Sequence, residues 1–419
     1  MNNFYYQNQQ LQVEQLPVQQ IAAQVKTPFY CYSQSLIELA YQNYADNLTE
    51  LDTLICYAVK ANTNQAIIKV LADLGAGADV VSAGELKRAL LAGVPANKIV
   101  YSGVAKTEDE IAFALEQDIF QFNLESENEL QRVSKIAAKL NKTAHIAFRI
   151  NPDVDAKTHA KISTGKSENK FGIPISRARA IYAMAAALPG IKIQGVDVHI
   201  GSQLTCLEPF YNAFQLIQEL VIDLRNDGHE IKIIDLGGGL GVNYRAGEMA
   251  DSAIAEYCKK VSNLFKDMGC KLVLEPGRSL VAESGILVSS VVYKKKGEKR
   301  TFLIIDAAMN DLIRPSMYDA YHDIIAITKT ERTETYDVVG PICESGDTFA
   351  TQREMEAVDE GDLVAISMVG AYGAVMSSSY NTRLTAPEIL VKGRQFSVIK
   401  ARPTYEDLIG LDKTASWQK

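Results

Sequence analysis

The sequence has no excess of positive charge and little cysteine. Its 419 residues include 43 Lys and Arg against 51 Asp and Glu, which gives a net charge of -8. No nucleic-acid partner is expected, because no basic stripe is present that could displace counterions from phosphates. The 6 cysteines show no paired spacing. They are therefore predicted to be free thiols in a reducing cytoplasm.

Long apolar runs are also missing. No run approaches the length that spans a bilayer, and the first residues lack the charged start and apolar core of a signal peptide. We therefore expect no membrane partner and a cytoplasmic location. The short basic cluster at 294–296 and 299–300 is interpreted as a hairpin connection rather than a binding patch.

A regular alternation of short apolar strands and helical segments is present instead. Strands are predicted at 54–61, 77–82, 99–103, 120–125, 145–150, 193–200, 231–237 and 271–275. Helices are predicted at 63–74, 83–92, 107–117, 127–140, 176–188, 207–226 and 250–268. The pattern indicates an α/β protein with a (β/α)8 TIM-like barrel over residues 36–280. The absence of a GxGxxG motif in the first turn favours this closed barrel over an open doubly wound sheet.

A different pattern follows residue 280. Strands without long helices between them are predicted at 285–294, 300–306, 336–339, 363–366, 388–391 and 395–399, joined by turns that contain Gly, Pro and Asp. We expect an all-β domain, resembling a sandwich or barrel, from residues 281–419. Residues 1–35, which are Gln-rich and then extended with a strand at 27–32, are expected to join it.

Polar residues suited to catalysis fall at the carboxyl ends of the predicted barrel strands, where the active sites of such barrels lie. These ends hold Lys60, Asp79, His199, the glycine-rich run 237–241 and the segment 275–278. Each feature alone has a simpler explanation: a lysine that reaches water, a hydrogen-bonded histidine, or a turn. Their coincidence on one rim favours a functional site.

This set meets the demands of a pyridoxal phosphate site. Lys60 follows a buried strand, where a partly desolvated amine can form a Schiff base with a carbonyl. The glycines before a helix can present backbone N–H groups to a phosphate. Glu275 can hold the proton of the pyridine nitrogen, and His199 can stack on the ring.

Longer segments resemble a known family. The segments 57–62, 199–203, 237–241 and 275–278 resemble the fold-type III, alanine-racemase-like decarboxylases, which use pyridoxal phosphate. Cys-Glu-Ser-Gly-Asp at 343–347 and Gly-Ala-Tyr-Gly at 370–373 extend the likeness into the β domain, so that it covers nearly the whole chain. Within this family, the segments 314–318, 343–345 and 164–172 imply decarboxylation of meso-2,6-diaminopimelate to L-lysine.

The resemblance also implies roles for individual residues. Lys60 would carry the cofactor, His199 would stack on its ring, and Cys343 would protonate the carbanion. The implied cofactor-binding residues are Lys60, Asp79, His199, Ser202, Gly238, Gly239, Glu275, Gly277, Arg278 and Tyr372. The implied substrate-binding residues are Arg278, Arg314, Tyr318, Glu344 and Tyr372, and no metal site is expected. Because Cys343 and Glu344 reach the neighbouring subunit's cofactor in this family, a homodimer with shared active sites is implied.

The substrate preference also has a physical basis. Diaminopimelate ends in a second amino-acid head, whose carboxylate suits arginine and whose ammonium suits a carboxylate such as Glu344. A related decarboxylase acting on arginine, ornithine or carboxynorspermidine remains an alternative. A racemase would need a second acid–base residue on the opposite face of the cofactor. A non-catalytic carrier of the cofactor would be a single barrel without a β domain.

Overall fold

The structure is a computed structural model that describes residues 4–155, 158–159, 164–165, 169–245, 247, 249 and 252–418. The chain divides into two compact units. One unit is Glu38–Leu280, and the other combines Met1–Ile37 with Val281–Lys419.

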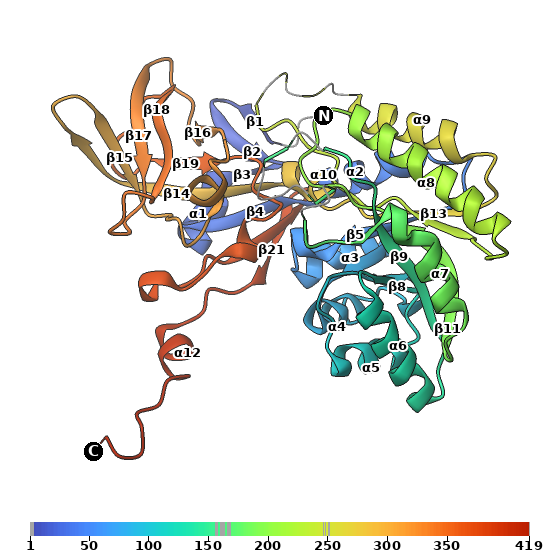
Figure 1. The fold of residues 1–419 in the computed structure, drawn as a ribbon. Coiled ribbons are helices and arrows are strands. Elements are labelled where there is room, and N and C mark those ends of the chain that lie inside the picture. Colours follow the sequence, from blue (N-terminus) through green and yellow to red (C-terminus); the bar gives the residue numbers. More distant parts are fainter. Residues whose placement is uncertain are drawn as a thin grey trace. The chain divides into compact units, whose positions relative to one another are not determined.

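A closed parallel barrel forms the centre of the first unit, as the sequence predicts (Figure 1). In the described part of the chain, eight strands follow one another around it, and β13 pairs back onto β5. These strands are β5 (Thr53–Ala58), β6 (Gly77–Val80), β7 (Ile99–Tyr101), β8 (Gln121–Leu124), β9 (Ala144–Asn151), β11 (Ile191–Asp197), β12 (Ile233–Asp235) and β13 (Lys271–Leu274). The short β10 (Ile173–Pro174) pairs with β9 outside this ring.

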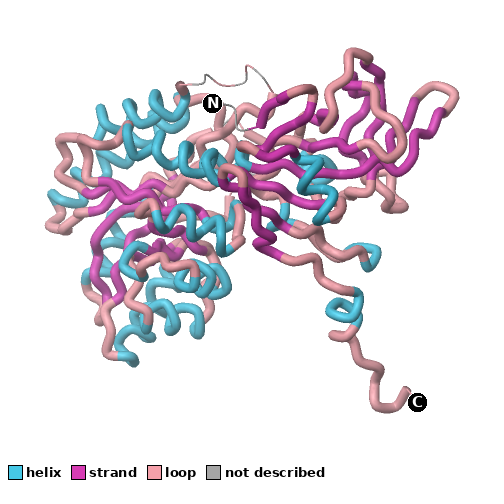
Figure 2. Tube along the Cα trace, turned by 180° about the vertical axis from the view of Figure 1, so that it is seen from behind, coloured by secondary structure: helices cyan, strands magenta, loops and turns pink. Residues whose placement is uncertain are grey.

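Helices surround the barrel strands (Figure 2). They are α2 (Gln34–Asp46), α3 (Gln65–Asp73), α4 (Ala83–Leu91), α5 (Glu108–Glu116), α6 (Glu127–Leu140), α7 (Ala178–Ala186), α8 (Glu208–Asn226), α9 (Ala253–Phe265) and α10 (Arg278–Val281). Side-chain caps decide where several of them begin. Ser82, Thr107 and Ser126 each accept a hydrogen bond from a backbone N–H in the first turn of the following helix. The predicted helix at 107–117 accordingly starts one residue later.

The first barrel strand is shorter than predicted. It ends at Ala58, and Val59–Ala61 form a 3₁₀ turn that is closed by a bond from Asn62 N to Val59 O. Lys60 therefore lies on a turn beyond the strand rather than within it. The apolar residues after Ala58 do not pair in the sheet. Val59 and Ala61 are instead buried in the turn, which is why a strand was predicted over the whole of 54–61.

The second unit is rich in β-structure. It contains β1 (Phe4–Gln7), β2 (Gln10–Val13), β3 (Leu16–Pro17), β4 (Phe29–Ser33), β14 (Gly285–Lys296), β15 (Thr301–Ile305), β16 (Ile324–Ala326), β17 (Thr333–Val339), β18 (Thr348–Glu356), β19 (Leu363–Ile366), β20 (Glu388–Lys392) and β21 (Gln395–Lys400). Its helices are α1 (Val18–Val25), α11 (Arg314–Tyr318) and α12 (Tyr405–Ile409). The larger sheet runs β18-β17-β15-β14-β4-β20-β21, and β19 pairs with both β14 and β16.

The two ends of the chain build one core in this unit. β4 pairs antiparallel with β14 and parallel with β20, so that an N-terminal strand lies inside a sheet of C-terminal strands. Phe29 and Cys31 of β4 pack with Val288 and Ile389 in a fully buried cluster. The prediction that the N-terminal strand joins the β domain is confirmed.

Other predictions for this unit were less complete. The residues predicted to be extended before β4 include helix α1, whose Val18 and Ile21 are buried three positions apart on one face. β16 and β18 were missed, and β18 contains four consecutive polar residues, 351–354, which interrupt any apolar pattern. The basic cluster lies at the predicted hairpin, since β14 and β15 are antiparallel neighbours.

Two predicted segments extend past the described residues. The first two residues of the predicted helix at 250–268, residues 250 and 251, lie outside the described residues. The described helix, α9, spans Ala253–Phe265. Residues 166–168 of the segment 164–172 also lie outside. Among the described residues, no helix combines the length and hydropathy that a membrane crossing requires.

Candidate active site

The carboxyl ends of the barrel strands bring the sequence-predicted residues of this unit to one rim. Lys60 follows β5, Asp79 lies in β6, His199 follows β11, the glycines follow β12 and Glu275 follows β13. Parallel strands in a closed ring place these positions at the same end of the barrel. In the observed topology these positions lie at one end of the barrel, as the sequence predicts.

The amine of Lys60 is held by a buried carboxylate. Lys60 Nζ lies 3.0 Å from Asp79 Oδ2, and the Asp79 side chain is 0% exposed whereas that of Lys60 is 36% exposed. The other carboxylate oxygen, Asp79 Oδ1, is buried and has no hydrogen-bond partner among the described residues. A buried oxygen without a partner is costly, so this atom is suited to a donor from a bound molecule.

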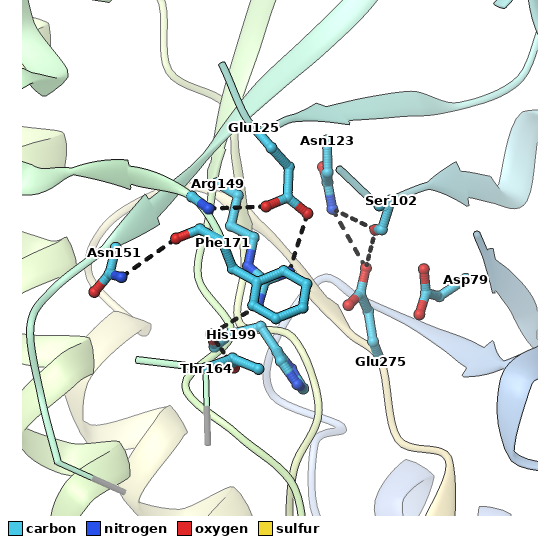
Figure 3. Close-up of polar contacts among 12 residues, drawn as sticks. Asp79, Ser102, Asn123, Glu125, Arg149, Asn151, Thr164, Phe171, His199 and Glu275 are labelled. Carbon is cyan, nitrogen blue, oxygen red and sulfur yellow. Dashed lines mark hydrogen bonds and ion pairs between the residues drawn. The ribbon is translucent and has the colours of Figure 1, made fainter. Parts of the chain in front are cut away.

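Three further carboxyl groups meet inside the barrel. Oxygen atoms of Asp197, Asp235 and Glu275 lie within 4.8 Å of one another, and all three residues are buried. Asn123 links two of them, because its Nδ2 donates to Asp235 Oδ2 at 3.1 Å and to Glu275 Oε1 at 3.4 Å. Ser102 Oγ also approaches Glu275 Oε1, at 3.5 Å (Figure 3).

This crowding favours the protonated forms of these acids. Burial, followed by the nearby charges of Asp235, Asp79 and Asp197, raises the pKa of Glu275 well above its usual range. Burial likewise raises the pKa of Asp235 to about 6, although hydrogen bonds from Asn123 and Gly237 oppose that rise. Like charges this close cannot all ionise, so the cluster retains protons near neutral pH.

The same three acids are the described residues whose ligand atoms are grouped closely enough for a metal ion. Oxygen donors of this kind suit hard cations such as Mg²⁺ or Ca²⁺. The sequence-based expectation of no metal site remains an expectation.

His199 is kept neutral and fixed in place. Burial, followed by the positive charges of Arg149 and Lys60, lowers the pKa of the imidazole well below its usual range. Its Nδ1 accepts a hydrogen bond from the backbone N–H of Gly238 at 3.1 Å. The ring is therefore an uncharged flat surface whose Nδ1 carries no proton.

The backbone of His199 is held by Arg149, which the sequence analysis did not single out, and by Thr164, which lies in the segment 164–172 that it did. Arg149 Nη2 and Thr164 Oγ1 both donate to the carbonyl oxygen of His199, each at 3.1 Å (Figure 3). Arg149 is itself paired with Glu125 at 3.1 Å and lies over the ring of Phe171 at 4.8 Å. Glu125 directly follows β8 and Arg149 lies near the end of β9, and this place near strand ends was the signal that could have identified the two residues.

The glycine loop after β12 packs directly against its neighbours. A Cβ at Gly238 would lie 2.1 Å from the carbonyl oxygen of Glu275, and one at Gly239 would lie 2.3 Å from that of Gly201. Gly239 also has a φ of +113°, which side-chain-bearing residues rarely adopt. No other residue type fits this cradle without displacing the backbone.

A buried arginine adds positive charge beside this loop. Arg278 donates to Ser202 Oγ at 3.1 Å and to the hydroxyl of Tyr244 at 2.8 Å. Gly277 precedes it, and a Cβ there would lie 3.0 Å from Cβ of Ala58. Arg278 and Ser202, both predicted site residues, are thus in direct contact.

The remaining predicted residues lie in the second unit. Arg314 is buried at the start of α11 and Tyr318, at its end, is partly buried. Cys343 and Glu344 are exposed, and Glu344 accepts a hydrogen bond from the hydroxyl of Tyr380. Tyr372 has a φ of +56°, an unusual value for a residue with a side chain.

These features fit pyridoxal phosphate. The barrel offers one amine next to a buried carboxylate, a glycine cradle with an adjacent guanidinium, and an acid of raised proton affinity. Asp79 Oδ1 supplies a buried acceptor that still lacks a donor among the described residues.

Comparisons with known proteins agree with this geometry. Residues 34–282 match the family model described as the pyridoxal-binding domain of pyridoxal-dependent decarboxylases. A diaminopimelate decarboxylase from Zymomonas mobilis is 45% identical over 417 residues, 99% of either chain. One from Pseudomonas aeruginosa is 47% identical, over 97% of this chain and 98% of its own.

Solved structures give the same result. The diaminopimelate decarboxylase of Helicobacter pylori complexed with L-lysine has a TM-score of 0.91 at 42% identity, covering 94% of this chain and 98% of its own. That of M. jannaschii in complex with L-lysine has a TM-score of 0.94 at 38% identity, covering 99% of both chains.

Proposed function

Since the chain belongs to the diaminopimelate decarboxylases, a family of pyridoxal-dependent enzymes, we propose that it converts meso-2,6-diaminopimelate to L-lysine and carbon dioxide. This reaction would be the last step of lysine biosynthesis, in the cytoplasm. The observation that carries the proposal is one combination of groups at the end of the barrel. It consists of the ion pair between Lys60 and Asp79, the glycine cradle, and the buried cluster of three acids.

Pyridoxal phosphate, when bound, withdraws the electron pair that loss of carbon dioxide leaves on carbon. Lys60 supplies the amine that attaches the cofactor, and Asp79 holds that amine in position. Gly238 and Gly239 would let the phosphate approach backbone N–H groups, and Arg278 and Ser202 would donate hydrogen bonds to it. His199 offers a neutral face for the cofactor ring.

Glu275 holds a proton at the pyridine nitrogen. Burial and the neighbouring acids raise the pKa of Glu275, so its carboxyl group retains a proton that it could share with a ring nitrogen bound beside it. Glu275 would thereby keep a proton at the position where the bound cofactor needs it for its electron-withdrawing role.

Residues of the second unit complete the site in this proposal. Arg314 and Tyr318 bind the distal carboxylate of the substrate, with Arg278, and Glu344 binds the distal ammonium. Cys343 returns a proton to carbon after carbon dioxide leaves, and Tyr372 contacts cofactor and substrate. Cys343 and Glu344 would come from the neighbouring subunit of a homodimer. The two compact units would then be the two domains of each subunit.

The direct test is to supply meso-diaminopimelate with pyridoxal phosphate and to measure L-lysine and carbon dioxide. Arginine, ornithine, carboxynorspermidine and L-lysine are offered in parallel. We expect release of carbon dioxide from diaminopimelate with a kcat/KM at least ~100-fold above that for the others, since a misread charged head costs several kcal/mol. Equal or greater turnover of another substrate would contradict the proposal.

A further inference from the structure

We propose that His322 is a positioning residue that orients Arg314 and thereby sets the preference of the site for a ligand whose far end carries a carboxylate. The inference rests on the proposed function, because it takes Arg314 as the group that binds this carboxylate. It adds a residue that neither the sequence patterns nor the barrel rim indicated.

The contact between the two side chains is short and buried. Nη1 of Arg314 lies 2.7 Å from Nε2 of His322, and the two residues are 6% and 1% exposed. A guanidinium has donors only, so Nε2 of the histidine must accept and carries no proton. This fixes one of the two ring nitrogens.

The other ring nitrogen is fixed from the opposite side. Nδ1 of His322 lies 2.8 Å from the carbonyl oxygen of Ser367, which can only accept. His322 is therefore a neutral imidazole with its proton on Nδ1. A neutral ring orients the guanidinium and leaves its positive charge available to a ligand. A carboxylate in the same place would orient the guanidinium but would also neutralise its charge.

Hydrogen bonds also hold the backbone around His322. Arg353 of β18 donates to the carbonyl oxygen of His322 at 3.0 Å and to Asp323 Oδ1 at 3.2 Å. The guanidinium of Arg353 also lies 4.3 Å from the centre of the Tyr321 ring. Ser367, which follows β19, donates its N–H to the carbonyl oxygen of Asp323 at 2.8 Å.

The imidazole of His322 thus ties α11 to Ser367 after β19, and the backbone of His322 is bonded to Arg353 of β18. A guanidinium is a planar fork, so holding Nη1 fixes the plane in which its remaining N–H groups donate. Recognition of a carboxylate by such a fork depends on that plane. Loss of the His322 contact should therefore weaken carboxylate binding specifically.

Two substitutions separate the two ring nitrogens. His322→Asn keeps a donor for Ser367 and removes the acceptor for Arg314, whereas His322→Gln places an amide oxygen where Nε2 lies. Each variant, with Arg314→Ala and the wild type, is assayed as the cofactor-loaded enzyme. The measurements are KM for meso-diaminopimelate and the inhibition constants of L-lysine and of 1,5-diaminopentane, which has the same amines but no carboxylate.

We expect His322→Asn to raise KM and the L-lysine constant roughly tenfold, the effect of one misaligned charge-assisted bond. The 1,5-diaminopentane constant should change less than about twofold, and His322→Gln should recover most of the loss. The matched control is His145→Asn, at a histidine on β9 whose Nδ1 lies 2.9 Å from Gln194 Oε1, and it should leave all three constants unchanged.

Equal weakening of L-lysine and 1,5-diaminopentane by His322→Asn, or no recovery in His322→Gln, would overturn the inference. The inference would also be overturned if neither His322 variant showed a cooperative unfolding transition. His322 would then be needed for folding rather than for the orientation of Arg314. Failure of the proposed function is seen separately, as a wild type that makes no lysine. If Arg314→Ala weakens L-lysine and 1,5-diaminopentane equally, the role proposed for Arg314 is wrong, and the inference falls with it.

Discussion

At the scale of single residues, the barrel site combines one amine with several acids that share protons. Lys60 is next to a carboxylate, Asp79, one of whose oxygens has no hydrogen-bond partner among the described residues. Glu275 lies among carboxyl groups that raise its affinity for a proton. Three predictions belong to this scale.

Lys60→Ala should abolish attachment of the cofactor and turnover together. The wild type should show a visible absorption band that borohydride removes, with the added mass on the peptide that contains Lys60. The variant should show neither the band nor the mass. Near wild-type turnover in Lys60→Ala would refute the role of this lysine; Lys69→Ala, at an exposed lysine of α3, is the control.

Glu275→Gln should bind pyridoxal phosphate and lose turnover. An amide cannot hold the proton at the pyridine nitrogen, and loss of one preorganised group of this kind costs about 10²-fold in kcat. Single-turnover kinetics and cofactor titration measure the two effects. Glu127→Gln, at a partly exposed position of α6, should change neither. An unchanged kcat in Glu275→Gln would assign the ring nitrogen to another group.

Asp235 makes the stability of the cofactor-free protein depend on pH. Its folded-state pKa is raised from 3.8 to about 6, so between these values the folded state binds more protons than the unfolded state. The free energy of unfolding therefore falls as pH rises through this window, by an amount on the order of 3 kcal/mol for this group.

Asp235→Asn removes this ionisation. The free energy of unfolding of the variant minus that of the wild type should therefore increase between pH 4 and pH 7, because only the wild-type value falls. Urea unfolding at several pH values measures the difference. Asp46→Asn, which changes an exposed carboxylate of α2, should show a constant difference instead. A constant difference for Asp235→Asn would mean that this acid does not titrate in the window.

At the scale of elements, the turn after β12 is determined by contact with its neighbours. Gly239 combines a positive φ with a carbonyl oxygen 2.3 Å from where a Cβ would lie. The turn therefore cannot accept a side chain without moving away from Gly201. Because this turn is the proposed phosphate cradle, such a movement should weaken cofactor binding.

Gly239→Ala should weaken cofactor binding at least ~10-fold and destabilise the protein by about 1–3 kcal/mol. Gly93→Ala is the matched control, because Gly93 has a φ of +93° but nothing within 4 Å of its Cβ position. It should cost about 1 kcal/mol and leave cofactor affinity unchanged. Equal effects on cofactor affinity would show that backbone strain, and not the collision, is responsible.

At the scale of the whole molecule, the proposed dimer predicts complementation between inactive chains. Lys60 lies in the barrel unit and Cys343 in the β-rich unit. If each active site takes these residues from different subunits, a mixed dimer of Lys60→Ala and Cys343→Ala has one site with both mutations and one with neither. With random exchange, about a quarter of all sites should be active.

The control is a mixture of Lys60→Ala with Glu275→Gln. Both substitutions lie in the barrel unit, so every site of a mixed dimer keeps one of them and activity should not recover. Exchange is verified by mass spectrometry of differently tagged chains. Activity of the first mixture no higher than that of the separate variants, despite exchange, would rule out shared sites.

The sequence alone determined the alternation of elements and the end of the barrel where chemistry collects. Strands buried on both faces are apolar throughout, and helices carry their caps in the local sequence, so both are readable without contacts. Lys60, Asp79, His199 and Glu275 were predictable for the same reason, because each lies in or directly after an apolar strand. Motifs common to a known family added the cofactor and the substrate.

Only the tertiary structure decided which of these groups meet. The approach of Asp197, Asp235 and Glu275 depends on barrel closure, which joins strands distant in the chain. The pairing of β4 with β14 and the bond between Arg314 and His322 depend likewise on folding of the second unit. Local sequence encodes the conformation and burial of a segment, but its partners are set by long-range packing, and the pKa values and orientations of side chains follow from those partners.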